Sequence, residues 1–140
     1  CLKDTRVGIL NKISQWMYSS GEDVQQTFFL HGAAGTGKSA IAHTIGKKCK
    51  DENCLGAFFC FDRTFFMQRT PSKALQSIAY NMAIYVPQLG DCLAEILDKN
   101  PFVLSSSSLK EQWQTLILKP AKLVDKSKLV VIIVDALDEC

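Results

Sequence analysis

A short glycine-rich segment, GAAGTGKS at positions 32–39, limits the possible folds of this chain more than any other part of its sequence. It fits the pattern G-x-x-x-x-G-K-[ST], in which glycines let the backbone curl around an anion so that successive N–H groups converge on it. The pattern binds phosphate where a strand leads into it and a helix follows, because the helix adds the positive end of its dipole. Residues 27–31 (TFFLH) have the composition of that strand, and 38–49 that of the helix. The sequence therefore predicts a phosphate-binding loop.

Each part of this loop has its own predicted task. Lys38 would place its ammonium group on the β- and γ-phosphates of a nucleotide, and the hydroxyl of Ser39 would bind Mg²⁺. The other predicted phosphate-binding residues supply backbone N–H groups, and they are Gly32, Ala33, Ala34, Gly35, Thr36 and Gly37.

A second candidate site follows the aliphatic run 129–134 (LVVIIV). A strand that is apolar on both faces is typical of a parallel sheet covered on both sides. Asp135 comes directly after this strand, where nucleotide-binding enzymes hold Mg²⁺. Because parallel strands end at the same edge of a sheet, Asp135 and the loop after His31 should open on one crevice.

Two further acids, Asp138 and Glu139, extend this site. A carboxylate beyond the metal-binding Asp can orient an attacking water, so both are candidate catalytic residues, with Glu139 preferred. Either acid could instead cap a following helix. A GTPase would usually show Asp-x-x-Gly here, and Asp138 at the glycine position argues against that class.

The remaining pattern predicts an α/β fold with a parallel sheet. Helices are expected over residues 4–18, from a Thr70-Pro71 start, around 89–97, and from a capping box at 108–111 to Pro120, which should kink or end that helix. A further strand is expected over 55–61. The order β-α-β-α-α-α-β implies parallel strands joined by helical crossovers.

Composition narrows the function classes. The chain is 47% apolar and 21% charged with a net charge of +2, which excludes a disordered chain and does not favour a nucleic-acid or membrane-surface partner. Its longest aliphatic run is far shorter than the ~20 residues of a membrane-spanning helix. The six cysteines lack C-x-x-C spacing, so reduced thiols and a cytoplasmic location are expected, with disulfides as the alternative.

With both motifs placed, the chain resembles the NACHT domain of fungal signal-transduction (STAND-class) P-loop NTPases. The segments that carry this resemblance are 28–45, 55–63, 69–83 and 130–140, and the Asp-x-x-Asp-Glu spacing at 135–139 is the most telling. The family often has Gly where this chain has Ala136. The resemblance implies a three-layer α/β/α P-loop NTPase fold, with a lead-in helix and linker at 1–26 and the core at 27–140.

The resemblance also implies a nucleotide switch. An ADP-bound form exchanges to ATP with Mg²⁺, self-associates through its NACHT domains, and signals between an effector domain and C-terminal repeats in self/non-self recognition, heterokaryon incompatibility or cell death. ATP hydrolysis in the complete domain is expected to be slow. Thr5 and Arg6 lie where the family's lead-in approaches the adenine. Arg63 and Arg69 could sense phosphate, although a solvated or structural charge is the commoner role for such residues.

Family members continue past the acid pair into a further strand, which inserts between the phosphate-loop strand and the Asp135 strand. We therefore expect the 140 residues to form an incomplete core that is truncated at this second motif. Three other functions remain open: a module that binds nucleotide without hydrolysis, a metabolic phosphotransferase such as a nucleoside kinase, and a nucleic-acid-remodelling ATPase, which the balanced charge disfavours.

Overall fold

A computed structural model describes residues 6–19, 21, 25–62, 64, 70–125 and 128–139. The regular elements, in chain order, are α1 (Val7–Met17), α2 (Lys38–Asp51), β1 (Leu55–Cys60), α3 (Pro71–Tyr85), α4 (Pro87–Lys99), the 3-10 helix η2 (Pro101–Ser105), α5 (Leu109–Gln112), the π-helix η3 (Trp113–Leu118), α6 (Lys119–Ala121), β2 (Val131–Asp135) and the 3-10 helix η4 (Leu137–Glu139).

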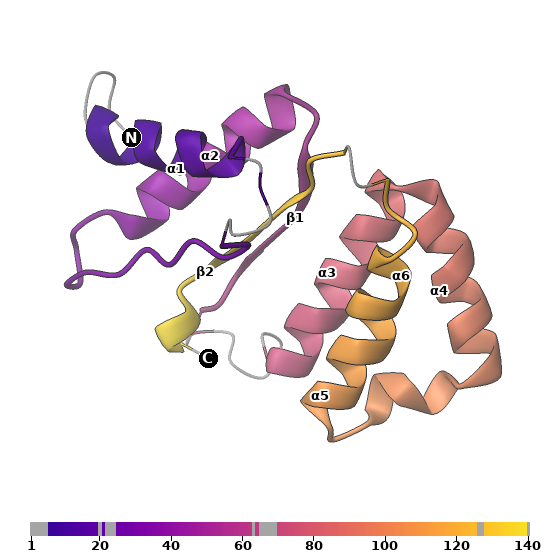
Figure 1. The fold of residues 1–140 in the computed structure, drawn as a ribbon. Helices are drawn as coiled ribbons and strands as arrows, with labels where there is room; N and C mark the ends of the chain where they lie inside the picture. Colours follow the sequence, from indigo (N-terminus) through magenta and orange to yellow (C-terminus); the bar gives the residue numbers. More distant parts are fainter. Residues whose placement is uncertain are drawn as a thin grey trace.

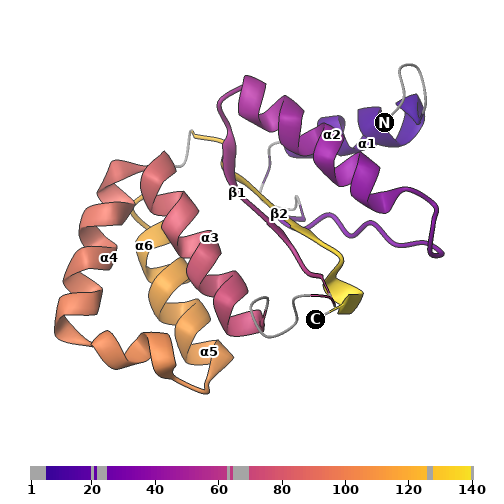
Figure 2. The same cartoon turned by 180° about the vertical axis from the view of Figure 1, so that it is seen from behind.

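The two strands lie between two groups of helices (Figures 1 and 2). β1 and β2 pair in parallel, with Cys60 opposite Asp135 at their carboxyl ends. One apolar cluster joins α1, α2 and Val131 on one face, and a second joins α3 to α6 and Ala57 on the other. The predicted α/β class is consistent with this arrangement.

Helices α1 and α2 lie side by side and run in the same direction. Ser14 accepts a 2.8 Å hydrogen bond from the Nζ of Lys48, and the hydroxyl of Tyr18 donates to Glu52, so the carboxyl ends of both helices lie together. Ile41 and Ile45, one helical turn apart on α2, are buried in one cluster with Ile13 and Met17 of α1. The amino-terminal ends of both helices therefore lie together too.

The helices on the other face begin at the residues that the sequence indicated. Thr70 caps α3 by accepting from the N–H of Lys73, and Ser108 caps α5 by accepting from the N–H of Glu111. The predicted capping box is only half formed, because the Glu111 carboxylate accepts from the Ser106 hydroxyl at 2.6 Å instead of from the backbone of Ser108.

Pro120 does not kink the last helix sharply. The backbone before it adopts π-helical hydrogen bonding over Trp113–Leu118, and the helix ends one residue after the proline, at Ala121. A proline has no N–H, and its ring crowds the carbonyl four residues earlier. The wider π-helical turn accommodates both effects, so the prediction that the helix ends near Pro120 is confirmed.

The predicted strand at 27–31 is wrong, because this segment has no regular secondary structure. Phe28 and Leu30 pack on the α1–α2 cluster while Phe29 is exposed, so the side chains alternate as they would in a strand. However, the sheet of the described residues contains only β1 and β2. A strand needs a ladder of backbone hydrogen bonds with a neighbour, which this segment lacks.

The prediction that the strand at 129–134 is covered on both faces is also wrong. The strand begins at Val131, and Ile132 and Val134 are 36% and 41% exposed. Both side chains lie on the face of the sheet opposite α2. On that face, helix α3 packs over β1 more than over β2. Trp113, at the start of η3, is exposed as well. No helix among the described residues has the length and apolar character to cross a bilayer.

Candidate functional site

The glycine-rich segment forms a tight loop directly before α2. Gly35 and Gly37 have φ angles of 74° and 80°, and a residue other than glycine adopts such angles only at a cost in free energy. Both the N–H and the hydroxyl of Thr36 donate to the carbonyl of Ala33, at 3.4 and 2.8 Å. The loop therefore has the left-handed turns that a backbone needs to wrap around an anion.

Lys38, the first residue of α2, reaches back across this loop. Its Nζ donates to the carbonyls of Gly32 and Ala33 at 2.9 and 3.1 Å. An ammonium group has three protons, so two are directed at the loop and one is left for a ligand. The side chain thus lies at the mouth of the loop, where the sequence motif places the phosphate-binding lysine.

A second cation approaches the loop from the start of α1. Arg6 donates from its guanidinium to the carbonyl of Thr36, and a Cβ atom added to Gly37 would lie 2.6 Å from its Nη2. This position is on the loop itself, and the approach of Arg6 to an adenine, which the resemblance implied, stays a prediction. The other residues named on the same grounds, Thr5, Arg63 and Arg69, lie outside the described residues.

Asp135 lies at the carboxyl end of β2 and is only 7% exposed. One carboxylate oxygen accepts the N–H of Ala136 at 2.9 Å, and the other lies 3.8 Å from the sulfur of Cys60, whose single proton also has the Phe61 carbonyl as an acceptor at 3.2 Å. Sequence reasoning missed Cys60, because only the register of the two strands brings it opposite Asp135. Ala136 has a φ of 54°, so the chain turns sharply after the acid.

The two further acids fall in the short helix η4. Asp138 is exposed and Glu139 is half-buried, and the N–H of Glu139 donates to the carbonyl of Ala136 at 2.8 Å. The helix is one turn long, so neither acid caps a longer helix within the described residues. Their catalytic roles stay predictions.

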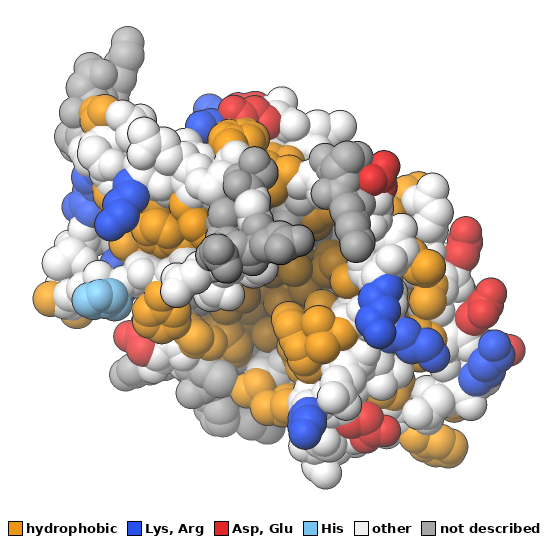
Figure 3. Space-filling view, viewed as in Figure 1, with side chains coloured by type: hydrophobic (Ala, Val, Ile, Leu, Met, Phe, Trp, Pro, Cys, Tyr) orange, Lys and Arg blue, Asp and Glu red, His pale blue; other side chains and the backbone are white. Residues whose placement is uncertain are grey.

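One large cavity of about 1320 Å³ joins the two motifs. Gly32 and Lys38 of the loop border it together with Asp135 and Asp138, so the structure brings these four predicted residues to one space. Ser39 is exposed in the first turn of α2, and neither it nor Glu139 lines the cavity. The rest of its wall is mainly apolar, with polar side chains such as Gln25, Thr27 and Asp125 among them. Figure 3 shows hydrophobic side chains gathered around a hollow near the centre of the molecule.

The sequence predicted Mg²⁺ bound together with a nucleotide at this site. The described residues contain no group of three or more His, Cys, Asp or Glu side chains that could hold a metal ion. Mg²⁺ is usually held by one or two protein oxygens, with water and phosphate oxygens completing the shell. Asp135 and the hydroxyl of Ser39 are the oxygens that would fill this role.

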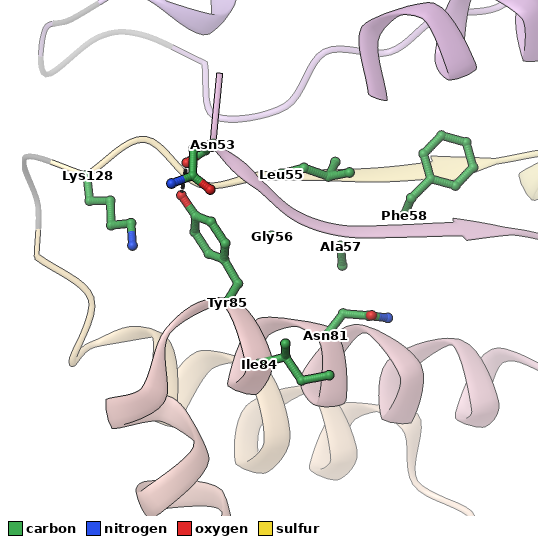
Figure 4. Close-up of a pocket in the computed structure, with 9 residues that line it drawn as sticks. All are labelled: Asn53, Leu55, Gly56, Ala57, Phe58, Asn81, Ile84, Tyr85 and Lys128. Carbon is green, nitrogen blue, oxygen red and sulfur yellow. Dashed lines mark hydrogen bonds between the residues drawn. The ribbon is translucent and has the colours of Figure 1, made fainter. Parts of the chain in front are cut away.

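A smaller cavity of about 490 Å³ lies between β1 and α3, at the amino-terminal end of β1 (Figure 4). The hydroxyl of Tyr85 donates to the carbonyl of Asn53, and the Nζ of Lys128 lies 4.2 Å from the centre of the Tyr85 ring. This is the opposite end of the strand from Cys60 and Asp135. The cavity is therefore separate from the candidate site.

A family model described as nephrocystin 3, N-terminal, matches residues 7–140. The chain belongs to this family. The nephrocystin 3 N-terminal family differs from the NACHT family that the motifs resemble, and a NACHT relationship is not confirmed. The nephrocystin 3 match includes the glycine-rich loop and the acids from Asp135 to Glu139. No curated protein and no solved structure matches the chain.

Proposed function

We propose that this chain binds a nucleoside di- or triphosphate with Mg²⁺, with ADP and ATP as the ligands. One observation carries the proposal: the loop that fits G-x-x-x-x-G-K-[ST] borders the same cavity as Asp135. Gly32 to Gly37 would direct backbone N–H groups at the phosphates, and Lys38 would neutralise part of their charge. Mg²⁺ held by Ser39 and Asp135 would neutralise more.

The proposed nucleotide binding also implies a particular fold. We propose a P-loop NTPase core of which one strand is missing, between residues 27–31 and β2. Three observations support it: the side chains of 27–31 alternate without a ladder, Ile132 and Val134 are exposed, and the cavity lies beside both segments. Such a nucleotide-binding core, in a longer chain of the NACHT type, would act as a signalling switch that self-associates and hydrolyses ATP slowly with the help of Glu139 and Asp138.

Calorimetric titration of ADP and ATP with Mg²⁺ into the 140-residue chain tests the binding step. Lys38→Ala removes a charge-assisted contact with phosphate, and we expect it to weaken binding by roughly tenfold to a hundredfold. Lys47→Ala is the matched control, because Lys47 is an exposed lysine of the same helix. Adenosine, which has no phosphate, should bind weakly to all three proteins.

Equal affinity of the wild type and Lys38→Ala for ADP would refute the proposal, and so would an absence of binding by the wild type. Adenosine binding as tightly as ADP would show that the phosphate loop does not carry the affinity. A nucleotide module without hydrolysis would bind in the same way but release no phosphate from ATP.

A further inference from the structure

Two cationic groups and two helix ends meet at one loop. Arg6 immediately precedes α1, and its guanidinium donates to the carbonyl of Thr36. Because α1 and α2 run in the same direction, the amino-terminal ends of both helices lie at this loop. Neither helix has an acidic residue in its first turn, and neither has a side-chain cap.

This arrangement concentrates positive charge. A helix carries about half a positive elementary charge at its amino-terminal end, and two such ends side by side repel each other. Arg6 and Lys38 add two full charges, and within the described residues neither forms an ion pair. Both side chains instead donate to backbone carbonyls of the loop, Arg6 to that of Thr36 and Lys38 to those of Gly32 and Ala33. An anion at the loop would relieve this repulsion.

We infer that Arg6 links occupancy of the phosphate loop to the docking of α1 on α2. A phosphate group bound at the loop offers the guanidinium a charged, bidentate acceptor in addition to the Thr36 carbonyl, because the guanidinium has five N–H donors. Since Arg6 is the residue next to Val7, the start of α1 is then held to the ligand as well as to the loop. This inference rests on the proposed nucleotide binding and assigns a regulated element to the same site.

The two halves of α1 are attached to the protein in different ways. Its buried contacts come mainly from Ile13 and Met17, and its carboxyl end is fastened to α2 through Ser14 and Tyr18. At the amino-terminal end of α1, Arg6 provides a polar attachment to the rest of the described structure. By thermodynamic linkage, a ligand that tightens this attachment must itself bind more tightly because of it.

The test compares four proteins, the wild type, Arg6→Ala, Arg6→Lys and the control Lys12→Ala, which removes an exposed positive charge from α1 itself. Calorimetry with Mg²⁺–ADP and with pyrophosphate should show at least tenfold weaker binding by Arg6→Ala. Arg6→Lys keeps the charge but loses the fork of donors, so we expect an intermediate affinity. Lys12→Ala should bind like the wild type.

Amide exchange of α1 gives a readout that a purely structural role would not change. Saturating ADP should slow exchange in residues 9–17 of the wild type at least fivefold more than in α4, and this extra protection should be absent in Arg6→Ala. The inference would be overturned if ADP slowed exchange in α1 of Arg6→Ala by the same factor as in the wild type, even if exchange in the variant were faster throughout. It would also be overturned if the two proteins bound ADP with equal affinity. If the wild type binds no ADP, the proposed function itself fails. If it binds ADP and only the Arg6 comparison is negative, the linkage alone fails.

Discussion

Replacing Ala136 by glycine should stabilise the protein, although glycine substitutions usually destabilise. Ala136 has a φ of 54°, in the left-handed region, at the turn between Asp135 and η4. An L-residue pays roughly 1–2 kcal/mol for this conformation, because its Cβ crowds the following carbonyl. Glycine avoids that cost but loses about 0.5–1 kcal/mol through the greater freedom of the unfolded chain. The midpoints of these two ranges leave a net gain of about 0.75 kcal/mol.

Urea unfolding measures this difference. With a slope of about 2 kcal/mol per molar urea, the midpoint should rise by roughly 0.3–0.5 M while the slope stays unchanged. The matched control is Ala94→Gly, at an exposed position inside α4, where helical φ angles give glycine no advantage. That variant should lose about 1 kcal/mol.

Whether Ala136→Gly stabilises or destabilises the protein tests the left-handed conformation of residue 136. If Ala136→Gly destabilises the protein as much as Ala94→Gly does, the turn is not held in the left-handed conformation and the reasoning is refuted. The same variant should also leave the position of Asp135 intact, because the hydrogen bond from residue 136 to Oδ1 comes from the backbone.

Two further predictions concern stability. Gln112 is 0% exposed, accepts from the Ser72 hydroxyl at 2.9 Å and donates to the Ser106 carbonyl at 2.8 Å. Gln112→Leu should therefore lower the free energy of unfolding, measured with urea, by about 2–3 kcal/mol. Gln114→Leu, at an exposed position of η3, should change it little. Burial, with a smaller effect of the neighbouring thiol, raises the pKa of Cys49 from 9.0 to about 12. The folded state therefore keeps a proton that the unfolded state releases, so stability should fall as pH rises from 9 towards 12, and an equally steep fall in Cys49→Ala would contradict this cause.

Features that depend on neighbours along the chain were predictable. The start of α3 at Thr70-Pro71 and that of α5 at Ser108 follow from side chains that bond to the backbone three residues ahead. The glycine-rich loop is equally local, since its turns need glycine at Gly35 and Gly37 whatever surrounds them. These parts of the fold and of the site could be read from short stretches of sequence.

Features that depend on distant partners were not predictable. Residues 27–31 have the composition of a strand, but among the described residues no neighbouring strand pairs with them, and composition cannot supply one. The exposure of Ile132 and Val134 reflects how far the helices extend over β2, which the aliphatic run itself does not encode. The contact of Arg6 with Thr36 likewise depends on the packing of α1 beside α2.

The exposed strand β2 has a consequence for the behaviour of the chain in concentrated solution. Its sequence is rich in β-branched residues and contains no proline, glycine or charge before Asp135, and such segments stack into amyloid-like zippers when their backbone groups are accessible. β-Sheet proteins restrain this hazard with charged residues that flank the segment. Lys128 and Asp135 stand on either side of the aliphatic run. We therefore expect the exposed charge of Lys128 to limit aggregation from the folded state, and the charge of the nearly buried Asp135 to do so when the strand is released from the fold.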